Sequence, residues 1–267
     1  MMNKNIYFSI IIVSLNTKKK LRNTLESIYK QKIYPKNYEI IVVDGMSIDG
    51  TQEEILNRKN KIDKLIIEKD TGIYDAMNKG IKYANGEWII FLNSGDLFYK
   101  NNVLKKIYSY KLSENDVIYG DTIINNKEFK YRINGKLFDK NSINIPFCHQ
   151  SSFVKRHLLK KYNFDLKYKI CSDFNFFIKI KKKIKIFKKI NLIISTVEAG
   201  GLSDNNRFKA FLENLKIIYR NVPSFKNFFK IIYFFLFLLI GKLFKYFLPT
   251  MIINKVLRIK YKKNIIN

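Results

Sequence analysis

Uninterrupted apolar runs alternate, in the first part of the chain, with segments in which apolar side chains recur every three or four positions. In the first such segment Leu21, Leu25 and Ile28 fall on one helical face. Strands that alternate with helices in this order predict a parallel sheet of the α/β class. The predicted strands are 6–15, 39–43, 64–68 and 88–92, and the predicted helices are 51–57, 72–84 and the segment around Leu25.

The pattern becomes less regular after residue 101. The stretch 183–190 alternates Lys with apolar residues in its first half. A solvated strand edge explains this alternation, because no RNA-binding motif accompanies it. Elsewhere we expect helices at 103–112 and 172–182, a strand at 117–119, a hairpin-like segment at 125–131, and apolar stretches at 184–187 and 192–197.

The last part of the chain, 222–267, contains neither Asp nor Glu. Its uncharged centre, 231–241, would rise about 16 Å as a helix against a hydrocarbon core of about 30 Å, so a simple membrane span is not expected. Basic residues such as Lys255 and Arg258 follow it and suit phospholipid headgroups. We therefore predict a folded domain over 1–221 and a basic, apolar helical tail that attaches to the membrane. A helix that caps the core or forms a dimer contact is the alternative for the tail.

The chain of 267 residues carries 50 Lys and Arg against 22 Asp and Glu, a formal net charge of +28. This surplus favours anionic partners such as nucleic acid, anionic lipid or a phosphorylated small molecule, and charge alone does not choose among them. An AT-rich coding sequence would also enrich Lys, so a mutational explanation stays open for part of it. Cys148 and Cys171 form no Cys-x-x-Cys pair, which fits a reduced, cytosolic interior. The first apolar run has no small-x-small cleavage site, so we interpret it as a strand and not a signal peptide.

Two carboxylates closely follow predicted strands. Asp44 ends one apolar run and opens a turn rich in Gly and Ser, and Asp96 follows another through Asn93, Ser94 and Gly95. Ligands of parallel sheets gather at the carboxyl ends of the strands. A strand-to-helix turn also favours Asp, Gly and Ser for structural reasons, so Asp44 alone is a weak indicator.

The segment EKDTGIYDAMNKGIKYANGEWIIFLNSGD at 68–96 resembles the inverting family-2 glycosyltransferases, particularly bacterial enzymes that build capsule or O-antigen repeat units. The resemblance implies the GT-A fold, a Rossmann-like nucleotide-binding α/β/α sandwich. It extends in the expected order to SIIIVSLNTKKKLRNTLESI at 9–28, PFCHQSSF at 146–153, YKICSDFNFF at 168–177 and GGLS at 200–203.

The resemblance also implies a role for each matching residue on the donor side. Asp96 matches the last acid of the family's metal-binding stretch, which implies Mg²⁺ or Mn²⁺ to neutralise the departing diphosphate. Because Asn93 and Gly95 replace carboxylates here, we expect weak metal binding without donor. Met77 stands where many relatives have Arg, which removes a phosphate partner. The implied contacts with the nucleotide sugar are Asp44, Asp70, Asn78, Ser94 and Asp96.

On the acceptor side, Asp173 matches the family's catalytic base, which takes the proton of the acceptor hydroxyl. Without the resemblance, Ser172 and Asp173 would be interpreted as a helix N-cap. His149 and Gln150 match a segment that lines the acceptor side, and His149 is expected to contact the acceptor or a phosphate. A lone His is more often structural, which is the alternative for His149.

These expectations combine into one hypothesis. An inverting enzyme would transfer a sugar from a nucleotide-sugar donor, expected to be a UDP-sugar, to a lipid-linked saccharide in capsule- or O-antigen-type polysaccharide synthesis. It would be held at the cytoplasmic face of the cell membrane against anionic lipid, with no nucleic acid as partner. The alternative is a catalytically weak scaffold that binds nucleotide sugar, because two acids of the metal-binding stretch are missing.

Overall fold

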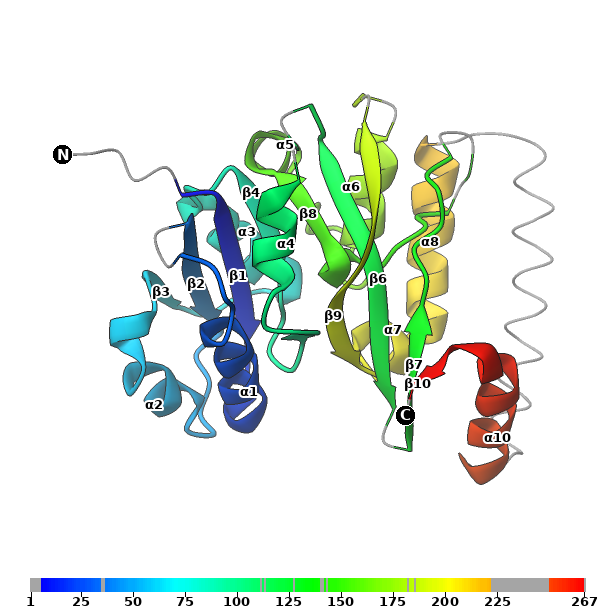
Figure 1. The fold of residues 1–267 in the computed structure, drawn as a ribbon, viewed down its shortest axis with the longest axis horizontal. Coiled ribbons are helices and arrows are strands. Elements are labelled where there is room, and N and C mark those ends of the chain that lie inside the picture. The colour runs from blue at the N-terminus through cyan, green and yellow to red at the C-terminus, as the bar shows by residue number, and fades with distance from the viewer. Residues whose placement is uncertain are drawn as a thin grey trace.

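Figure 1 shows the computed structural model of the chain. It describes residues 6–34, 37–110, 112, 114–126, 128–139, 142, 144–181, 183–184, 186–221 and 250–266.

The first part of the chain alternates strands and helices as predicted. The helical face of Leu21, Leu25 and Ile28 is fully buried, which is why α1 packs against the sheet. In chain order the elements are β1 (Phe8–Ser14), α1 (Lys18–Tyr29), β2 (Tyr38–Asp44), α2 (Thr51–Leu56), β3 (Lys64–Ile67), α3 (Ile73–Tyr83) and β4 (Trp88–Phe91).

The second part departs from the prediction in several places. The apolar stretch at 192–197 lies within one long strand, β9, which begins at Phe187, the last residue of the stretch at 184–187. The strand predicted at 117–119 continues into the hairpin as β6. Several elements were not predicted, among them β8, α5 and α8. The elements are β5 (Leu97–Phe98), α4 (Val103–Ser109), β6 (Val117–Asn126), β7 (Phe129–Ile133), β8 (Ser152–Lys155), α5 (Arg156–Tyr162), α6 (Ser172–Ile180), β9 (Phe187–Glu198), α7 (Leu202–Asn205), α8 (Arg207–Asn221), α10 (Thr250–Lys260) and β10 (Ile265–Ile266).

The described strands form one ten-stranded mixed sheet. Its main path is β10-β7-β6-β8-β4-β1-β2-β3, and β9 pairs with β5 and β6. The parallel prediction is confirmed for β4, β1, β2 and β3. Strand β8, which was not predicted, lies antiparallel between β4 and β6. The register of β1 against β2 pairs Ser14 with Asp44, so both strands end at the same edge.

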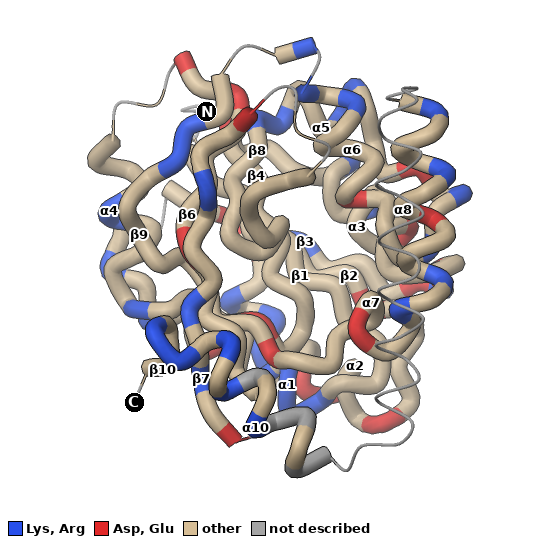
Figure 2. Tube along the Cα trace, turned by 90° about the vertical axis from the view of Figure 1, so that its right-hand side faces the viewer, with Lys and Arg blue, Asp and Glu red and all other residues tan. Residues whose placement is uncertain are grey.

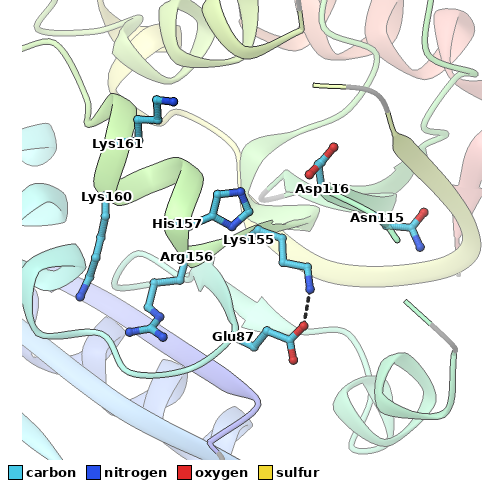
Figure 3. Close-up of a pocket in the computed structure, with 8 residues that line it drawn as sticks. All are labelled: Glu87, Asn115, Asp116, Lys155, Arg156, His157, Lys160 and Lys161. Atoms are coloured by element: carbon cyan, nitrogen blue, oxygen red, sulfur yellow. Dashed lines mark hydrogen bonds and ion pairs between the residues drawn. The ribbon is translucent and has the colours of Figure 1, made fainter. Parts of the chain in front are cut away.

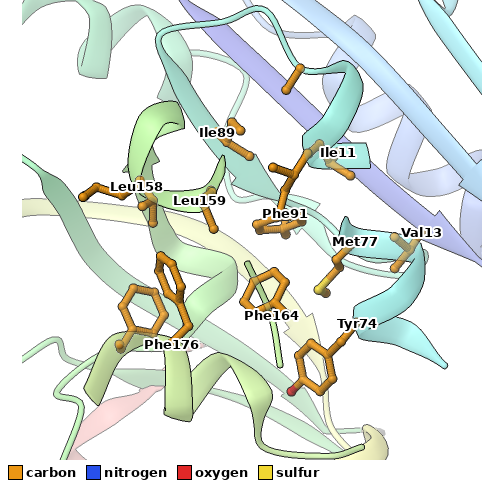
Figure 4. Packing of buried hydrophobic residues seen from close by; sticks show 14 of the residues in the cluster. Ile11, Val13, Tyr74, Met77, Ile89, Phe91, Leu158, Leu159, Phe164 and Phe176 are labelled. Carbon is orange, nitrogen blue, oxygen red and sulfur yellow. The ribbon is translucent and has the colours of Figure 1, made fainter. Parts of the chain in front are cut away.

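Helices cover both faces of this sheet, as the α/β/α prediction requires (Figure 1). Along β1, Ile10 and Ile12 face the cluster that contains α1 and α4, while Ile11 and Val13 face the cluster that contains α3, α5 and α6. Figure 4 shows the second cluster, in which Phe164 lies among side chains of β4, α3 and α6. Because strands buried on both faces need apolar residues at every position, the continuous runs are explained.

Glu39 is a buried carboxylate near the amino end of β2. It accepts hydrogen bonds from Ser9 Oγ at 2.5 Å and from the backbone N–H groups of Asn85 at 2.6 Å and Gly86 at 3.2 Å. A Cβ on Gly86 would lie 2.4 Å from the backbone nitrogen of Ser9, so the turn between α3 and β4 needs glycine for close approach. Glu39 thus joins β1, β2 and this turn at the edge away from Asp44.

The carboxyl-terminal elements pack on the rest of the fold in two places. Helix α8 contributes Ala210 and Ile217 to a buried cluster with Ile178 of α6. Strand β10 extends the sheet at β7, and Tyr261 stacks on Tyr131 with ring centroids 4.2 Å apart. The apolar centre of the predicted tail, 231–241, lies outside the described residues. None of the described helices is long and apolar enough to cross a membrane.

Candidate functional site

Asp44 is fully buried at the end of β2. Its Oδ2 accepts hydrogen bonds from Ser14 Oγ at 2.8 Å and Ser47 Oγ at 2.7 Å, and its Oδ1 accepts from the backbone N–H of Ser47 at 2.8 Å. A carboxylate has about four acceptor sites, so these three bonds leave little free capacity. The structure therefore gives Asp44 a clear part in fixing the loop after β2.

Asp70 lies against that loop from the neighbouring strand end. Its Oδ1 accepts a hydrogen bond from the N–H of Gly72 at 2.9 Å. A Cβ on Gly45 would lie 2.4 Å from Asp70 Oδ2, so glycine at position 45 lets the two loops meet. The predicted donor residues Asp44 and Asp70 thus belong to adjacent loops at the carboxyl edge of the sheet.

Asn78, also expected on the donor side, has its side-chain amide bonded to backbone. Its Nδ2 donates to the Phe164 carbonyl at 2.8 Å, and its Oδ1 accepts from the Phe164 N–H at 2.9 Å. These two bonds join α3 to the loop after α5. The structure thus gives Asn78 a structural task, and a nucleotide contact for it stays a prediction.

The loop 93–96 follows β4 and contains unpartnered oxygens. Ser94 donates its backbone N–H to Val13 at 3.1 Å, and Gly95 adopts a positive φ of 108°. Asn93 Oδ1 and Ser94 Oγ are buried and have no protein partner. Because a buried polar atom without a partner is costly, these two oxygens suit a bound ligand or cation.

Asp96 is 6% exposed and lies in an environment that disfavours the ionised carboxylate. Burial raises its pKa to about 7, and the Glu198 carboxylate adds to the rise. His149 and Gln150 oppose it through charge and a hydrogen bond, respectively. The predicted metal residue therefore lies close to both predicted acceptor residues.

Oxygen ligands from carboxylate, amide and hydroxyl groups are those that Mg²⁺ and Mn²⁺ prefer. The loop 93–96 offers one carboxylate with Asn93 Oδ1 and Ser94 Oγ nearby in the chain. Among the described residues no group of three or more His, Cys, Asp or Glu side chains could hold a metal ion. The residues therefore fit a cation that takes most of its ligands from a bound diphosphate and from water.

Asp173 lies in the first turn of α6 and receives two hydrogen bonds. His149 Nδ1 lies 2.9 Å from Oδ2, and the Tyr74 hydroxyl lies 2.7 Å from Oδ1. Burial alone would raise the pKa of Asp173, but the charge and hydrogen bond of His149 and the hydrogen bond of Tyr74 bring it below its usual value. The carboxylate is therefore held ionised and oriented.

His149 lies between the two acids. Burial would lower its pKa, but the hydrogen bond to Asp173 and the charges of Asp173 and Asp96 raise it. Its Nε2 is buried and has no protein partner. The residues His149 and Gln150 begin a short 3-10 turn, His149–Ser151, that connects to β8 and brings them beside both Asp96 and α6.

A cavity of about 340 Å³ borders this pair. Asp173 and His149 form its ionisable wall, and Phe174 and Phe177 of α6 and Phe147 form much of the rest, together with Asn144 and Ile145. No described Lys or Arg lines it. A group that enters this cavity meets a carboxylate that can accept a proton.

A larger cavity, of about 720 Å³, lies at the amino end of β4 (Figure 3). Lys155 pairs there with Glu87, while Lys160 and Lys161 extend in different directions. None of the predicted site residues lines this cavity. The candidate site therefore lies at the opposite, carboxyl edge of the sheet.

Two contributors to the site were not predicted. Tyr74 lies in the GIYDAMN stretch that carried the resemblance, so its position offered a signal. Glu213 of α8 accepts backbone hydrogen bonds from the segment before Asp173, and nothing in its local sequence pointed to this.

Comparisons with known proteins agree with this geometry. The family described as glycosyl transferase family 2 matches residues 9–186. A PGL/p-HBAD biosynthesis glycosyltransferase of Mycobacterium bovis is 32% identical over 219 residues, which cover 78% of this chain and 83% of that protein.

Solved structures show the same fold. S. aureus TarS in complex with UDP-GlcNAc has a TM-score of 0.61 at 17% identity, over 85% of this chain and 70% of that chain. The mannosyltransferase PcManGT from Pyrobaculum calidifontis, in complex with GDP-Man and Mn²⁺, has a TM-score of 0.63 at 15% identity, over 81% of this chain and 64% of that chain. Together with the family match and the 32% identical relative, these structures identify the chain as a glycosyltransferase of family 2 with the GT-A fold.

Proposed function

We propose that the protein transfers a sugar from a nucleotide-sugar donor to a hydroxyl group of a glycan acceptor, with inversion at the anomeric carbon. The observation that carries the proposal is the carboxylate of Asp173, which two hydrogen bonds hold at the wall of a cavity. A positioned carboxylate of this kind is the group that a single displacement requires as general base.

In the proposed step, the acceptor oxygen attacks the anomeric carbon from the face opposite the diphosphate. A bond forms between that oxygen and the anomeric carbon, and the bond between the anomeric carbon and the diphosphate oxygen breaks. Asp173 takes the hydroxyl proton, and the nucleoside diphosphate leaves with the bonding electrons. His149 and Tyr74 keep Asp173 ionised beforehand and fix its orientation, which lowers the cost of bringing base and hydroxyl together.

The donor would lie along the loops of Asp44 and Asp70. TarS and PcManGT have been solved with UDP-GlcNAc and with GDP-Man and Mn²⁺, respectively, which supports a nucleotide sugar and a divalent cation for this chain too. We expect a UDP-sugar. The cation supplies positive charge to the leaving diphosphate when bound, and Asp96, Asn93 and Ser94 are the residues that would hold it.

The acceptor is proposed to be a lipid-linked saccharide in the synthesis of a surface polysaccharide of the capsule or O-antigen type. Relatives support this class by their names: one acts in PGL/p-HBAD biosynthesis, and GgaB of Bacillus subtilis is a minor teichoic acid biosynthesis protein. An enzyme held at a bilayer meets such acceptors at high effective concentration.

Membrane attachment at the cytoplasmic face is proposed from the carboxyl-terminal segment. On α10, Ile252, Val256 and Ile259 are spaced as one helical face and are 38%, 55% and 69% exposed. Figure 2 shows Lys and Arg gathered around α10, β10 and β7. An exposed apolar face beside basic residues suits the headgroup region of an anionic bilayer.

A donor screen tests the proposal. Purified protein is given a panel of nucleotide sugars with a lipid-linked acceptor, and nucleotide release, product and anomeric configuration are measured. We expect Asp173→Asn to abolish transfer while leaving UDP affinity nearly unchanged. Binding of UDP without turnover by the wild type would instead favour the scaffold, and a product with retained configuration would overturn the inverting mechanism.

A further inference from the structure

Helix α8 lies beyond the family match, which ends at residue 186, yet it reaches the segment before Asp173. The Glu213 carboxylate accepts hydrogen bonds from three consecutive backbone N–H groups, each at 2.9 Å. The Oε1 atom accepts from Lys169, and the Oε2 atom accepts from Ile170 and Cys171.

We propose that Glu213 is a positioning residue for the catalytic base, and that α8 is therefore part of the catalytic unit. The inference rests on the proposed function, in which Asp173 takes the acceptor proton. Glu213 does not line the cavity beside Asp173, and its hydrogen bonds go to the backbone that leads into α6, so it acts through that backbone.

The segment that Glu213 holds is the entry to α6. Cys171 is the residue before the first helical position, and Asp173 follows two residues later. Backbone N–H groups ahead of a helix have no partner within it, so an outside acceptor has to satisfy them. A carboxylate provides two acceptors and a charge that the amino end of α6 favours.

The same segment is held from the opposite side by α3. The Tyr74 hydroxyl lies 2.7 Å from the Ile170 carbonyl as well as 2.7 Å from Asp173 Oδ1. The phenol has one proton, which the Ile170 carbonyl and Asp173 Oδ1 share. The position of the Ile170 carbonyl therefore affects the hydrogen bond that Asp173 receives. A shift of Ile170 would therefore disturb the orientation of Asp173 even though the base itself is unchanged.

Packing ties α8 to the segment independently of the charge. Tyr168, Ile170 and Cys171 lie in one buried cluster with Ala210 and Ile217 of α8. Loss of the Glu213 carboxylate therefore leaves α8 docked and frees only the three N–H groups. A loss of activity in such a variant can therefore be assigned to the position of Asp173 and not to unfolding of α8.

The test compares Glu213→Gln and Glu213→Ala with the wild type in kcat, donor KM, UDP affinity by calorimetry and Tm. Misplacement of a catalytic group by about 1 Å can cost about 100-fold in rate, so we expect kcat to fall about 10- to 100-fold in Glu213→Ala. Glu213→Gln keeps one acceptor oxygen and should fall between. Donor KM and UDP affinity should stay within about twofold, because Asp44 and Asp70 belong to other loops.

Two controls and one reference variant make the test decisive. Glu39→Gln alters a buried carboxylate that, like Glu213, binds backbone N–H groups, but at the opposite edge of the sheet. Lys216→Gln alters an exposed residue of α8. Both should keep the wild-type kcat, whatever Glu39→Gln does to Tm. If Glu213→Ala does not fold, the isosteric Gln variant decides.

Asp173→Asn distinguishes a failure of the positioning role of Glu213 from a failure of the proposed function. If Asp173→Asn abolishes transfer while both Glu213 variants keep the wild-type kcat, the positioning role is wrong and the proposed function stands. A fall in activity that only tracks the loss of folded protein, as judged by Tm, also overturns it. If Asp173→Asn keeps full activity, the proposed function itself fails.

Discussion

His149 Nδ1 and Asp173 Oδ2 lie 2.9 Å apart, which places a histidine from the turn before β8 against a carboxylate in the first turn of α6. Each residue changes the titration of the other. The pKa of His149 is raised and that of Asp173 is lowered, despite burial that would do the opposite to both. The pair therefore keeps a charged base in a partly enclosed site.

This relationship predicts the pH dependence of transfer. A base works only when it is ionised, so activity falls as the pH drops through the pKa of Asp173. His149→Gln removes the charge and should raise that pKa, and the acid limb of the kcat/KM profile should move up by about one pH unit or more. Tyr74→Phe should move it in the same direction by less. An acid limb that stays in place in His149→Gln would contradict the pairing.

We expect the buried carboxylate of Asp96 to lower the stability of the protein while it supports transfer. Its pKa is raised from 3.8 to about 7 by burial, so between these values the folded protein holds a proton that the unfolded chain releases. The contribution of Asp96 to stability without ligand should therefore fall as the pH rises from about 4 to about 7, and stay level above. At pH 8, roughly one unit above that value, Asp96→Asn should raise the free energy of unfolding by a few kcal/mol while lowering transfer.

Denaturant unfolding at acidic and alkaline pH, with and without UDP and Mn²⁺, checks this expectation. The ligands should stabilise the wild type more than Asp96→Asn if the carboxylate helps to hold the cation. A variant that gains no stability at the higher pH would show that the buried charge costs little.

The sequence predicted the part of the fold in which the local hydrophobic pattern of each strand matches its burial in the sheet. Strands β1, β2 and β4 are buried on both faces, so their apolar runs were unambiguous. Strand β8 offers only Phe153 and Val154 between polar residues, and its antiparallel place follows from pairing with distant strands. Such pairing leaves no local signal.

The candidate site, too, could be predicted only in part from the sequence. The loops after β2 and β4 could be located from strand ends alone, but the role of Asp173 needed the family resemblance, because Ser-Asp at a helix start is common. The contact of Glu213 with Ile170 could not be predicted, since these residues meet only when α8 folds back on α6.

Gly45→Ala tests the contact between the two donor-side loops. The new methyl group would lie 2.4 Å from Asp70 Oδ2, so the Asp70 side chain has to move. We expect UDP affinity to fall about 3- to 10-fold, which corresponds to about 1 kcal/mol, with a smaller effect on stability. Calorimetry measures it, and Gly201→Ala, where a methyl group would meet nothing within 4 Å, is the control. Unchanged affinity would remove Asp70 from the donor site.

Glu39→Ala should destabilise the fold without touching the chemistry. The change leaves Ser9 Oγ and the partly buried N–H of Asn85 without their acceptor, while the Gly86 N–H keeps its bond to Ser9 Oγ at 2.8 Å. An unsatisfied buried donor costs about 1–3 kcal/mol, so we expect a loss of about 2–4 kcal/mol in the free energy of unfolding. Denaturant titration measures the loss, and kcat per folded molecule should equal that of the wild type. A stability within about 0.5 kcal/mol of the wild type would contradict the bonding network.

The exposed face of α10 predicts binding to anionic membranes. Burying a side chain such as Val or Ile contributes about 1.5–3 kcal/mol, so Val256→Ser with Ile259→Ser should weaken binding to vesicles with anionic lipid about 100-fold or more. Co-sedimentation of the full chain with vesicles measures this. Leu137→Ser, at a side chain that is 82% exposed and lies outside α10, should bind as the wild type does. If the double variant sediments as well as the wild type, α10 does not enter the bilayer surface, and attachment has to come from another part of the chain.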